Sequence, residues 1–513
     1  MANNTNEYRF LSSTRNATTA IITQIMMGVV SFIERMVFNQ CFIPDYLGFY
    51  SLFKNIISVL SVAELGLSIA IAYSLYAPLA EDNYDEVRAI MFFLKKIYLA
   101  IGTAILICGL ILSIFLQFLV KTDVDMSAVR LYFIIFLLST VFEYYLSYKY
   151  ILFNADQKQY ITTLITNISW SVLYVVQIII SIKTHSFLFY SLCILIFDTI
   201  RCLFINTLAN KNYPYLKEYK PSKLSKESQK KILFNIKGLI LSKLGGVAVN
   251  STDSILISAI VGSSILGFYS NYQMITKGLL GFTTILPNAI TASLGNMGAT
   301  ESNDAVSDGY RYIDMSFFLL YGLMSVVLLN IINPIVGTFF GASRCLPFSS
   351  ALIICILFYL NNNKNLFNTY KSSLGLYWYD RYRPLISGAF NVIVSIILGK
   401  LIGFDGILLG TILTYVIIDL WVEPMIIFHK GFHTSSREYI SFAMARLLLI
   451  IALMFATHHV TNFLPETGIL SIFLKAIISL AITAFVLYLL FHKNIYVKQS
   501  IKAVKRFIFK KEA

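Results

Sequence analysis

Cationic residues occur inside long apolar stretches of the sequence, at Arg35, Lys54, Lys243 and Lys277. Acidic residues lie in the same stretches, at Glu34, Glu64 and Asp253. A charged side chain at the centre of a bilayer costs about 2.5–3.5 kcal/mol on insertion scales, so it is expected to face a hydrated cavity or a partner group. The acidic residues then either balance the cations or carry a coupling ion, Na⁺ or H⁺. Such a set is typical of a substrate or ion pathway through a membrane.

Helical phase groups these charges with other polar residues. At 100° per residue, each group falls on one side of its predicted helix, and the opposite side is apolar. The stripe residues include Lys54, Ser58, Ser61 and Glu64 in the stretch 47–78, Glu34 in 17–41, and Lys243, Asn250 and Asp253 in 236–261. Polar stripes in both halves of the chain predict a central, water-filled and partly cationic cavity.

Structural roles are the alternative for several of these residues. Glu34 and Arg35 are adjacent, so their side chains point about 100° apart and pair poorly with each other, but neighbouring helices could satisfy both. Lys243 lies near one end of its predicted helix, from which its ammonium could reach the membrane surface. Asp198 and Arg201 are spaced by three residues, and we expect them to form a local ion pair.

The composition requires that most of the chain faces lipid. Of 513 residues, 57% are hydrophobic and 13% are charged, whereas soluble domains average roughly 25% charged residues. This composition excludes a disordered chain, a secreted disulfide-rich domain and a soluble enzyme. No P-loop, H-E-x-x-H or G-x-S-x-G motif occurs, and no cysteine pair has metal-ligand spacing, so we expect neither catalysis nor a bound cofactor or metal.

Fourteen apolar runs are each long enough to cross a bilayer, which takes about 20 residues. Their approximate ranges are 17–41, 47–78, 92–119, 128–153, 160–182, 186–209, 236–261, 265–297, 312–340, 347–370, 381–401, 405–428, 438–462 and 467–491. Barrel strands are about 10 residues long and alternate in hydrophobicity, so these continuous runs favour helices. The sequence therefore predicts an all-α polytopic membrane protein with about 14 transmembrane helices.

The loops alternate between lysine-rich and lysine-poor, and the net charge is +14. Because cytoplasmic loops retain Lys and Arg, this alternation predicts that both termini lie in the cytoplasm. The longest basic connector, 210–235, follows the sixth helix. It predicts an N-terminal lobe at 1–209, a C-terminal lobe at 236–430, and two further helices with a basic cytoplasmic tail at 431–513.

An internal repeat supports the two lobes. The motif Leu-Gly-Phe-Tyr-Ser at 47–51 recurs at 266–270, an offset of 219 residues, and the same offset relates Glu34 to Asp253. The first two helices of each lobe therefore correspond. Six helices separate the copies, so the lobes have the same orientation and are related by an axis along the membrane normal.

Several motifs resemble those of the Wzx-type polysaccharide flippases, within the multidrug/oligosaccharidyl-lipid/polysaccharide exporter superfamily. They lie at 47–80, 147–160, 243–253 and 267–272. The resemblance implies a V-shaped, MATE-like pair of lobes that works by alternating access in the bacterial cytoplasmic membrane. It also implies an undecaprenyl-pyrophosphate-linked oligosaccharide as substrate, for O-antigen, capsule or exopolysaccharide, and a polysaccharide polymerase and assembly proteins as partners.

This resemblance gives the polar residues specific roles. A pyrophosphate needs fixed cations, for which the candidates are Arg35, Lys54, Lys243 and Lys277. A sugar needs hydrogen-bonding groups, for which the candidates are Ser58, Ser61, Asn250 and Asn271. Because the cations are mostly lysines, bidentate clamping of phosphate is less assured. The alternatives are a cation-coupled multidrug exporter of the same superfamily and a membrane polymerase that acts on the same lipid-linked unit.

Overall fold

The structure is a computed structural model that describes residues 2–61, 64–217, 224–226, 229–230, 232, 251–499 and 502. The candidate residues Lys243 and Asn250 lie outside these described residues. The chain divides into two compact units, Met1–Gly267 and Phe268–Ala513. No strand occurs in the described ranges, so the prediction of an all-α fold is confirmed.

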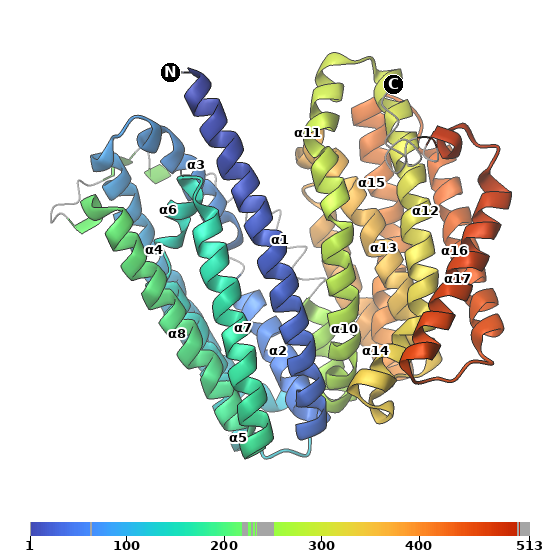
Figure 1. Cartoon of the computed structure of the whole chain (residues 1–513), viewed down its shortest axis with the longest axis horizontal. Coiled ribbons are helices and arrows are strands. Elements are labelled where there is room, and N and C mark those ends of the chain that lie inside the picture. The colour runs from blue at the N-terminus through green and yellow to red at the C-terminus, as the bar shows by residue number, and fades with distance from the viewer. Residues whose placement is uncertain are drawn as a thin grey trace. The chain divides into compact units, whose positions relative to one another are not determined.

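The first unit is a bundle of long helices, drawn from blue to green in Figure 1. They are α1 (Ala2–Cys41), α2 (Pro44–Leu60), α3 (Glu64–Ala80), α4 (Tyr84–Ile114), α5 (Met126–Leu146), α6 (Tyr150–Ala155), α7 (Gln159–Thr184) and α8 (Phe187–Asn212), followed by an apolar helix at Ser251–Val261. Helix α1 packs along α7, α4 packs along α5, and α5 and α7 both pack against α8. The interior of the bundle thus brings α1, α2, α5, α7 and α8 together.

The second unit contains the remaining helices (Figure 1). They are α10 (Ser263–Thr283), which starts at the end of the first unit, α11 (Ile285–Thr300), α12 (Asn303–Ile335), α13 (Phe348–Ser373), α14 (Arg383–Thr414), α15 (Leu420–Ile426), α16 (Arg437–Thr461) and α17 (Ile469–Phe491). Helix α12 is central, because α13, α16 and α17 all pack against it.

Helix α14 contains a reversal at Ile402 and Gly403, where Gly403 has a φ of 68°. The two segments then run side by side, since the Asn391 amide donates to the Thr411 hydroxyl at 2.8 Å. The predicted separate helices 381–401 and 405–428 are therefore present as the two arms of a hairpin. The second arm continues through α15 and ends at Phe432.

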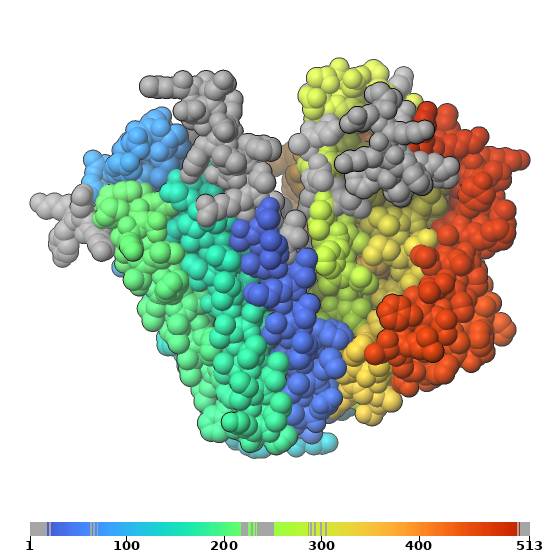
Figure 2. Space-filling view, viewed as in Figure 1, coloured from blue at the N-terminus to red at the C-terminus, as the bar shows by residue number. Residues whose placement is uncertain are grey.

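Eight helices in the described part of the chain are long and apolar enough to cross a membrane. Their outward faces carry exposed apolar side chains, as at Ile107 of α4, Val172 of α7 and Phe204 of α8. Figure 2 shows α7 and α8 side by side on the viewed face of the first unit. Exposed apolar residues on this scale indicate contact with lipid. The chain is a multi-pass membrane protein.

Three predicted helices are divided, and the expectation of continuous helices was wrong at these points. The span 128–153 forms α5 and α6. The span 47–78 forms α2, which ends at Leu60 before a turn at Ser61, and α3. The span 265–297 forms α10 and α11, which meet at Thr284. The repeat relates the last two spans, so the second helix of each copy is interrupted at nearly the same place.

Glu64 explains why a new helix begins after α2. Its carboxylate accepts hydrogen bonds from the Tyr144 hydroxyl at 2.6 Å and the Tyr98 hydroxyl at 3.5 Å. These bonds hold the negative charge in the first turn of α3, where the helix dipole favours it. The helix boundary is thus fixed by residues from α4 and α5.

The first unit ends later than the predicted connector at 210–235. Lys121 holds the later stretch to this unit, since its N–H donates to the Ser258 carbonyl at 3.1 Å and its carbonyl accepts from the Ser263 N–H at 3.0 Å. These bonds place the described helix at 251–261 with the first unit. The connector is described only in part, so its role as the lobe boundary stays a prediction.

The repeated motif marks a close backbone contact inside the first unit. A Cβ atom on Gly48 would overlap the carbonyl oxygen of Ser263, and a Cβ atom on Gly267 would overlap that of Pro44. These two contacts are related by the repeat offset of 219, and so are Asp45 and Ser264, which hydrogen-bond to each other. Glycine at both motif positions therefore lets the start of α2 approach the start of α10, within Met1–Gly267, at backbone distance.

Candidate functional site

The first unit holds an accessible cation inside its polar interior. Lys54 lies on α2, and its side chain is exposed. Its Nζ lies 4.4 Å from the ring centroid of Tyr50 and 5.2 Å from that of Trp170 on α7. Within the described ranges, no carboxylate oxygen lies within 4.0 Å of this ammonium. Two aromatic rings thus position Lys54, and its charge is left available to a ligand.

Glu34, one of the predicted acidic residues, accepts a hydrogen bond from a tyrosine hydroxyl. Glu34 on α1 is only 5% exposed, and its Oε1 accepts a hydrogen bond from the Tyr190 hydroxyl on α8 at 2.7 Å. Arg35 and Lys54 both lie within electrostatic range of this carboxylate. Arg35 is half-buried. The structure therefore brings the predicted residues Glu34, Arg35 and Lys54 into one neighbourhood.

The next charges in this interior are one guanidinium and two carboxylates, which together carry one net negative charge. Arg201 on α8 contacts Asp198 at 3.0 Å and Glu143 on α5 at 3.1 Å. The Ser139 hydroxyl donates to the second oxygen of Asp198 at 2.8 Å. The predicted ion pair between Asp198 and Arg201 is confirmed, and Glu143 joins it. This guanidinium is bound by two carboxylates, in contrast to the Lys54 ammonium.

The remaining predicted residues of α2 and α3 lie near Lys54 in the chain but differ in exposure. Ser58, one turn after Lys54, is exposed, whereas Ser61 is half-buried and its hydroxyl oxygen has no hydrogen-bond partner. Glu64 is bound by its two tyrosines. Lys54 and Ser58 are therefore the predicted α2 residues that a ligand can reach most directly.

The predicted residues at 253–277 have different surroundings. Asp253 is 8% exposed and belongs to the first unit. Lys277 is exposed on α10, and its ammonium donates to Gln273 at 3.3 Å. Asn271 is 0% exposed, so no ligand can reach its amide in this conformation. Its predicted role in sugar binding stays a prediction for other conformations.

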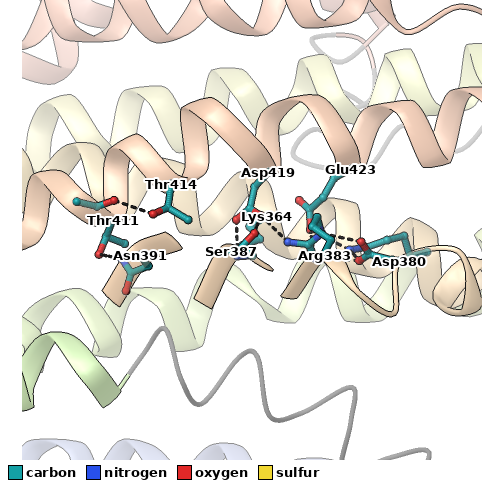
Figure 3. Close-up of polar contacts among 11 residues, drawn as sticks. Lys364, Asp380, Arg383, Ser387, Asn391, Thr411, Thr414, Asp419 and Glu423 are labelled. Carbon is teal, nitrogen blue, oxygen red and sulfur yellow. Dashed lines mark hydrogen bonds and ion pairs between the residues drawn. The ribbon is translucent and has the colours of Figure 1, made fainter. Parts of the chain in front are cut away.

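Sequence reasoning missed a buried charge network in the second unit, shown in Figure 3. Lys371 on α13 contacts Asp380 at 2.6 Å and Glu423 at 2.8 Å, and it is 1% exposed. Arg383 contacts Asp380 and Asp419 at 2.6 Å each and Glu423 at 2.8 Å, and Lys364 contacts Asp419 at 2.8 Å. Three cations therefore balance three carboxylates, and no net charge is left for a ligand.

A signal for this network was present in the sequence. Asp419 and Glu423 are spaced by four residues and so share a helix face, and Asp380 precedes Arg383 by three residues. Asp380 lies just before the membrane-spanning segment that starts at Arg383. Burial raises the pKa of this carboxyl, but hydrogen bonds from Arg383 and the charge of Lys371 outweigh burial and leave its pKa below the ordinary value.

A cavity of about 330 Å³ lies in the second unit, between α12, α16 and the end of α17. Its walls include Phe442, Leu449 and Phe491, and its charged groups include Asp314 and Arg446. These two residues form an ion pair with each other, and Tyr439 donates to Asp314 at 3.0 Å. The cavity is mainly apolar, and both of its arginines, Arg446 and Arg311, are already paired with carboxylates.

No group of three or more His, Cys, Asp or Glu residues is placed to hold a metal ion in the part of the chain that the structure describes. Polar contacts with a charged ligand are therefore the chemistry that the described site offers. In the first unit they come from Lys54 and Arg35, with Ser58 and the aromatic rings beside them.

No family model and no curated protein matches the sequence. Solved structures do match. Over 91% of this chain and 98% of the other, the fold is similar to that of the lipid II flippase MurJ in an inward closed conformation, with 15% identity and a TM-score of 0.63. It is also similar to an inward-facing multidrug resistance MATE family transporter of the MOP superfamily, over 83% of this chain and 98% of the other, with 13% identity and a TM-score of 0.58. The predicted MATE-like helical fold is thus confirmed.

Proposed function

We propose that this protein is a flippase, which moves an undecaprenyl-pyrophosphate-linked oligosaccharide from the inner to the outer leaflet of the bacterial cytoplasmic membrane. It works by alternating access, with both termini in the cytoplasm. The observation that carries this proposal is the exposed Lys54 ammonium, which two aromatic rings position and no described carboxylate neutralises.

Energetics support an anionic ligand at Lys54. A lysine within the membrane costs about 2.5–3.5 kcal/mol, and a cation–π contact returns about 0.5–2 kcal/mol. The remaining cost implies hydration or an anion at this site. The Arg201 guanidinium nearby is already bound by Asp198 and Glu143, so Lys54 is the cation that an arriving phosphate would meet first.

The other residues of the first unit have supporting roles in this proposal. Arg35 adds a second positive charge, and Ser58 offers a hydroxyl one turn from Lys54. Glu34 and Glu64 are candidates for ion coupling, because tyrosine hydroxyls bind both carboxylates inside the bundle. Protonation of either carboxylate would change those bonds.

The fold supports translocation in general terms. The two solved structures of similar fold are membrane transporters by name, and one of them is a lipid flippase. A multidrug exporter for organic cations fits the same fold, but an exposed ammonium would repel such a substrate. The lipid-linked oligosaccharide therefore agrees better with the electrostatics of the first unit.

The test measures on which leaflet lipid-linked oligosaccharides accumulate after the protein is depleted. A membrane-impermeant glycosidase reports the outer pool. We expect the units to accumulate in the protected inner leaflet. Single units on the accessible outer face would instead indicate a polymerase, and an unchanged pool would favour the drug exporter.

Lys54→Ala should reproduce the depletion phenotype. Lys96→Ala is the matched control, because Lys96 is also an exposed helix lysine over an aromatic ring, 4.6 Å from the centroid of Phe92. We expect the Lys96 variant to restore the outer pool in full. If both variants restore it equally, Lys54 does not bind the substrate.

A further inference from the structure

Trp170 occupies an unusual depth for a tryptophan. It lies near the middle of α7, which spans Gln159–Thr184, and at 1.5 Å per residue this is about 17 Å from the start of the helix. Tryptophans that anchor helices lie at the membrane interface. Trp170 is half-exposed, and its ring lies 5.8 Å from that of Tyr174, one turn further along. An interfacial anchor does not explain this position.

Two hydrogen-bond donors at this ring are open to a ligand. The Trp170 indole N–H makes no hydrogen bond in the described part of the chain, and its residue is half-exposed. Beside it, the Lys54 ammonium makes no ion pair with any described carboxylate. The two neighbouring donors are therefore available to an acceptor-rich ligand, as phosphates and sugar hydroxyls are.

Charged groups also lie beside Trp170. Asp198 and Arg201 line a crevice with the indole that has almost no open volume, and each is 8% exposed. The Arg201 Nε is buried and has no hydrogen-bond partner, although its Nη2 binds two carboxylates. In this conformation a sugar would contact the half-exposed ring itself, which suits a pyranose because a pyranose presents an apolar C–H face and a rim of hydroxyls.

We propose that Trp170, with Tyr174, forms the subsite for the sugar ring that is joined directly to the pyrophosphate, and that Lys54 binds the adjacent phosphate. This inference rests on the proposed function. One glycosidic oxygen separates the phosphorus from that ring, so the two must be bound side by side. Lys54 and Trp170 are placed in this way, with 5.2 Å between the ammonium and the ring centroid.

The test compares two kinds of ligand on the purified full-length protein in detergent. One is farnesyl pyrophosphate, and the others are farnesyl pyrophosphates that carry a single glucose, galactose or N-acetylglucosamine. Titration calorimetry gives the Kd of each. We expect at least one sugar-bearing ligand to bind about tenfold more tightly than the bare pyrophosphate.

Trp170→Leu should remove that preference, so that bare and sugar-bearing pyrophosphates bind this variant with Kd values within about twofold of one another. Trp170→Phe keeps a ring and should retain most of the preference. Trp421→Leu is the control, because Trp421 is an exposed tryptophan of the second unit. Lys54→Ala should weaken the binding of all the ligands.

Two results would overturn this inference and leave the proposed function standing. In one, Trp170→Leu keeps the preference for the sugar. In the other, the wild-type protein binds bare and sugar-bearing pyrophosphates equally, as a site for phosphate alone would. If the wild-type protein binds none of the ligands, the proposed function itself fails.

Discussion

At the residue scale, Lys54 shows that the partners of a cation indicate its role. Arg201 and Lys54 lie in the same helical bundle, but the first is bound by Asp198 and Glu143, whereas the second rests on aromatic rings. A cation with two carboxylates stabilises the bundle, and a cation over rings can exchange them for a phosphate. Burial and charge alone would not separate these two roles.

Charge at position 54 should matter more than the shape of the side chain. We expect Lys54→Arg to retain outward translocation, because a guanidinium keeps the charge and can contact a phosphate with two N–H groups. Lys54→Met, of similar length but neutral, should lose at least about tenfold in translocation rate. The glycosidase-accessible pool in cells that express each variant measures this. Equal activity of the two variants would contradict a role in binding phosphate.

Asp380 gives the second unit a predictable dependence on pH. Its pKa in the folded protein lies below the ordinary value of 3.8, so its charge stabilises the fold above that value, and this stabilisation is lost as the pH falls through the lower, folded pKa. Asp380→Asn should destabilise the protein by about 3–5 kcal/mol at pH 7, because it removes one partner from a buried ion network.

Thermal unfolding in detergent at several pH values tests this expectation. The difference in Tm between wild type and Asp380→Asn should be large at pH 7 and should shrink below pH 3.8. Asp85→Asn is a suitable control, because Asp85 pairs with Arg88 at the surface and exposed pairs contribute only about 0–1 kcal/mol. A difference that does not change with pH would show that Asp380 is uncharged in the folded protein.

Elements of this fold are set partly by sequence pattern and partly by distant contacts. Hydrophobic runs located the helices, because a bilayer selects long apolar segments. They did not locate the break between α2 and α3, since the bonds that fix Glu64 come from Tyr98 and Tyr144, far along the chain. No local signal such as proline marks that break.

The contact between α2 and α10 depends on two glycines of the repeat. Gly48→Ala or Gly267→Ala would drive a methyl group into a backbone carbonyl, so each should destabilise the protein by about 1–3 kcal/mol or more. A methyl group added at Gly28 or Gly278 would meet no atom within 4 Å. Gly28→Ala and Gly278→Ala should therefore be neutral or stabilising by up to about 1 kcal/mol.

Thermal unfolding of the four alanine variants, side by side, measures this difference. If all four have the same Tm, the starts of α2 and α10 do not meet at backbone distance. If Gly48→Ala and Gly267→Ala are each destabilised, the double variant should lose less than the sum of the two. The two glycines lie in one contact, so their effects are coupled.

For the whole molecule, the sequence predicted the helical membrane fold, the repeat and the polar interior of the first unit. It did not place Trp170 beside Lys54, because α7 joins α2 only through tertiary packing. It also did not show that Lys364, Lys371 and Arg383 meet three carboxylates. Local spacing reports pairs within one helix, whereas these contacts connect α13, the segment before α14, and the hairpin arms.

The two units are therefore expected to respond differently to the loss of a lysine. Lys371→Met removes a buried cation from Asp380 and Glu423, which should cost about 3–5 kcal/mol of stability. The protein that remains folded should bind a lipid pyrophosphate with unchanged Kd. Lys54→Met should do the reverse, with stability kept within about 0.5 kcal/mol and Kd raised at least about tenfold.

Measuring Tm and Kd on the same two preparations separates the roles. Lys371 stabilises the fold because its ammonium has carboxylate partners, and Lys54 serves recognition because its ammonium rests on Tyr50 and Trp170. If the folded Lys371→Met protein binds the lipid pyrophosphate more weakly than wild type, the second unit contacts the ligand as well. A fall in Tm without a change in Kd for Lys54→Met would make this lysine structural, because it would then stabilise the bundle without contacting the phosphate.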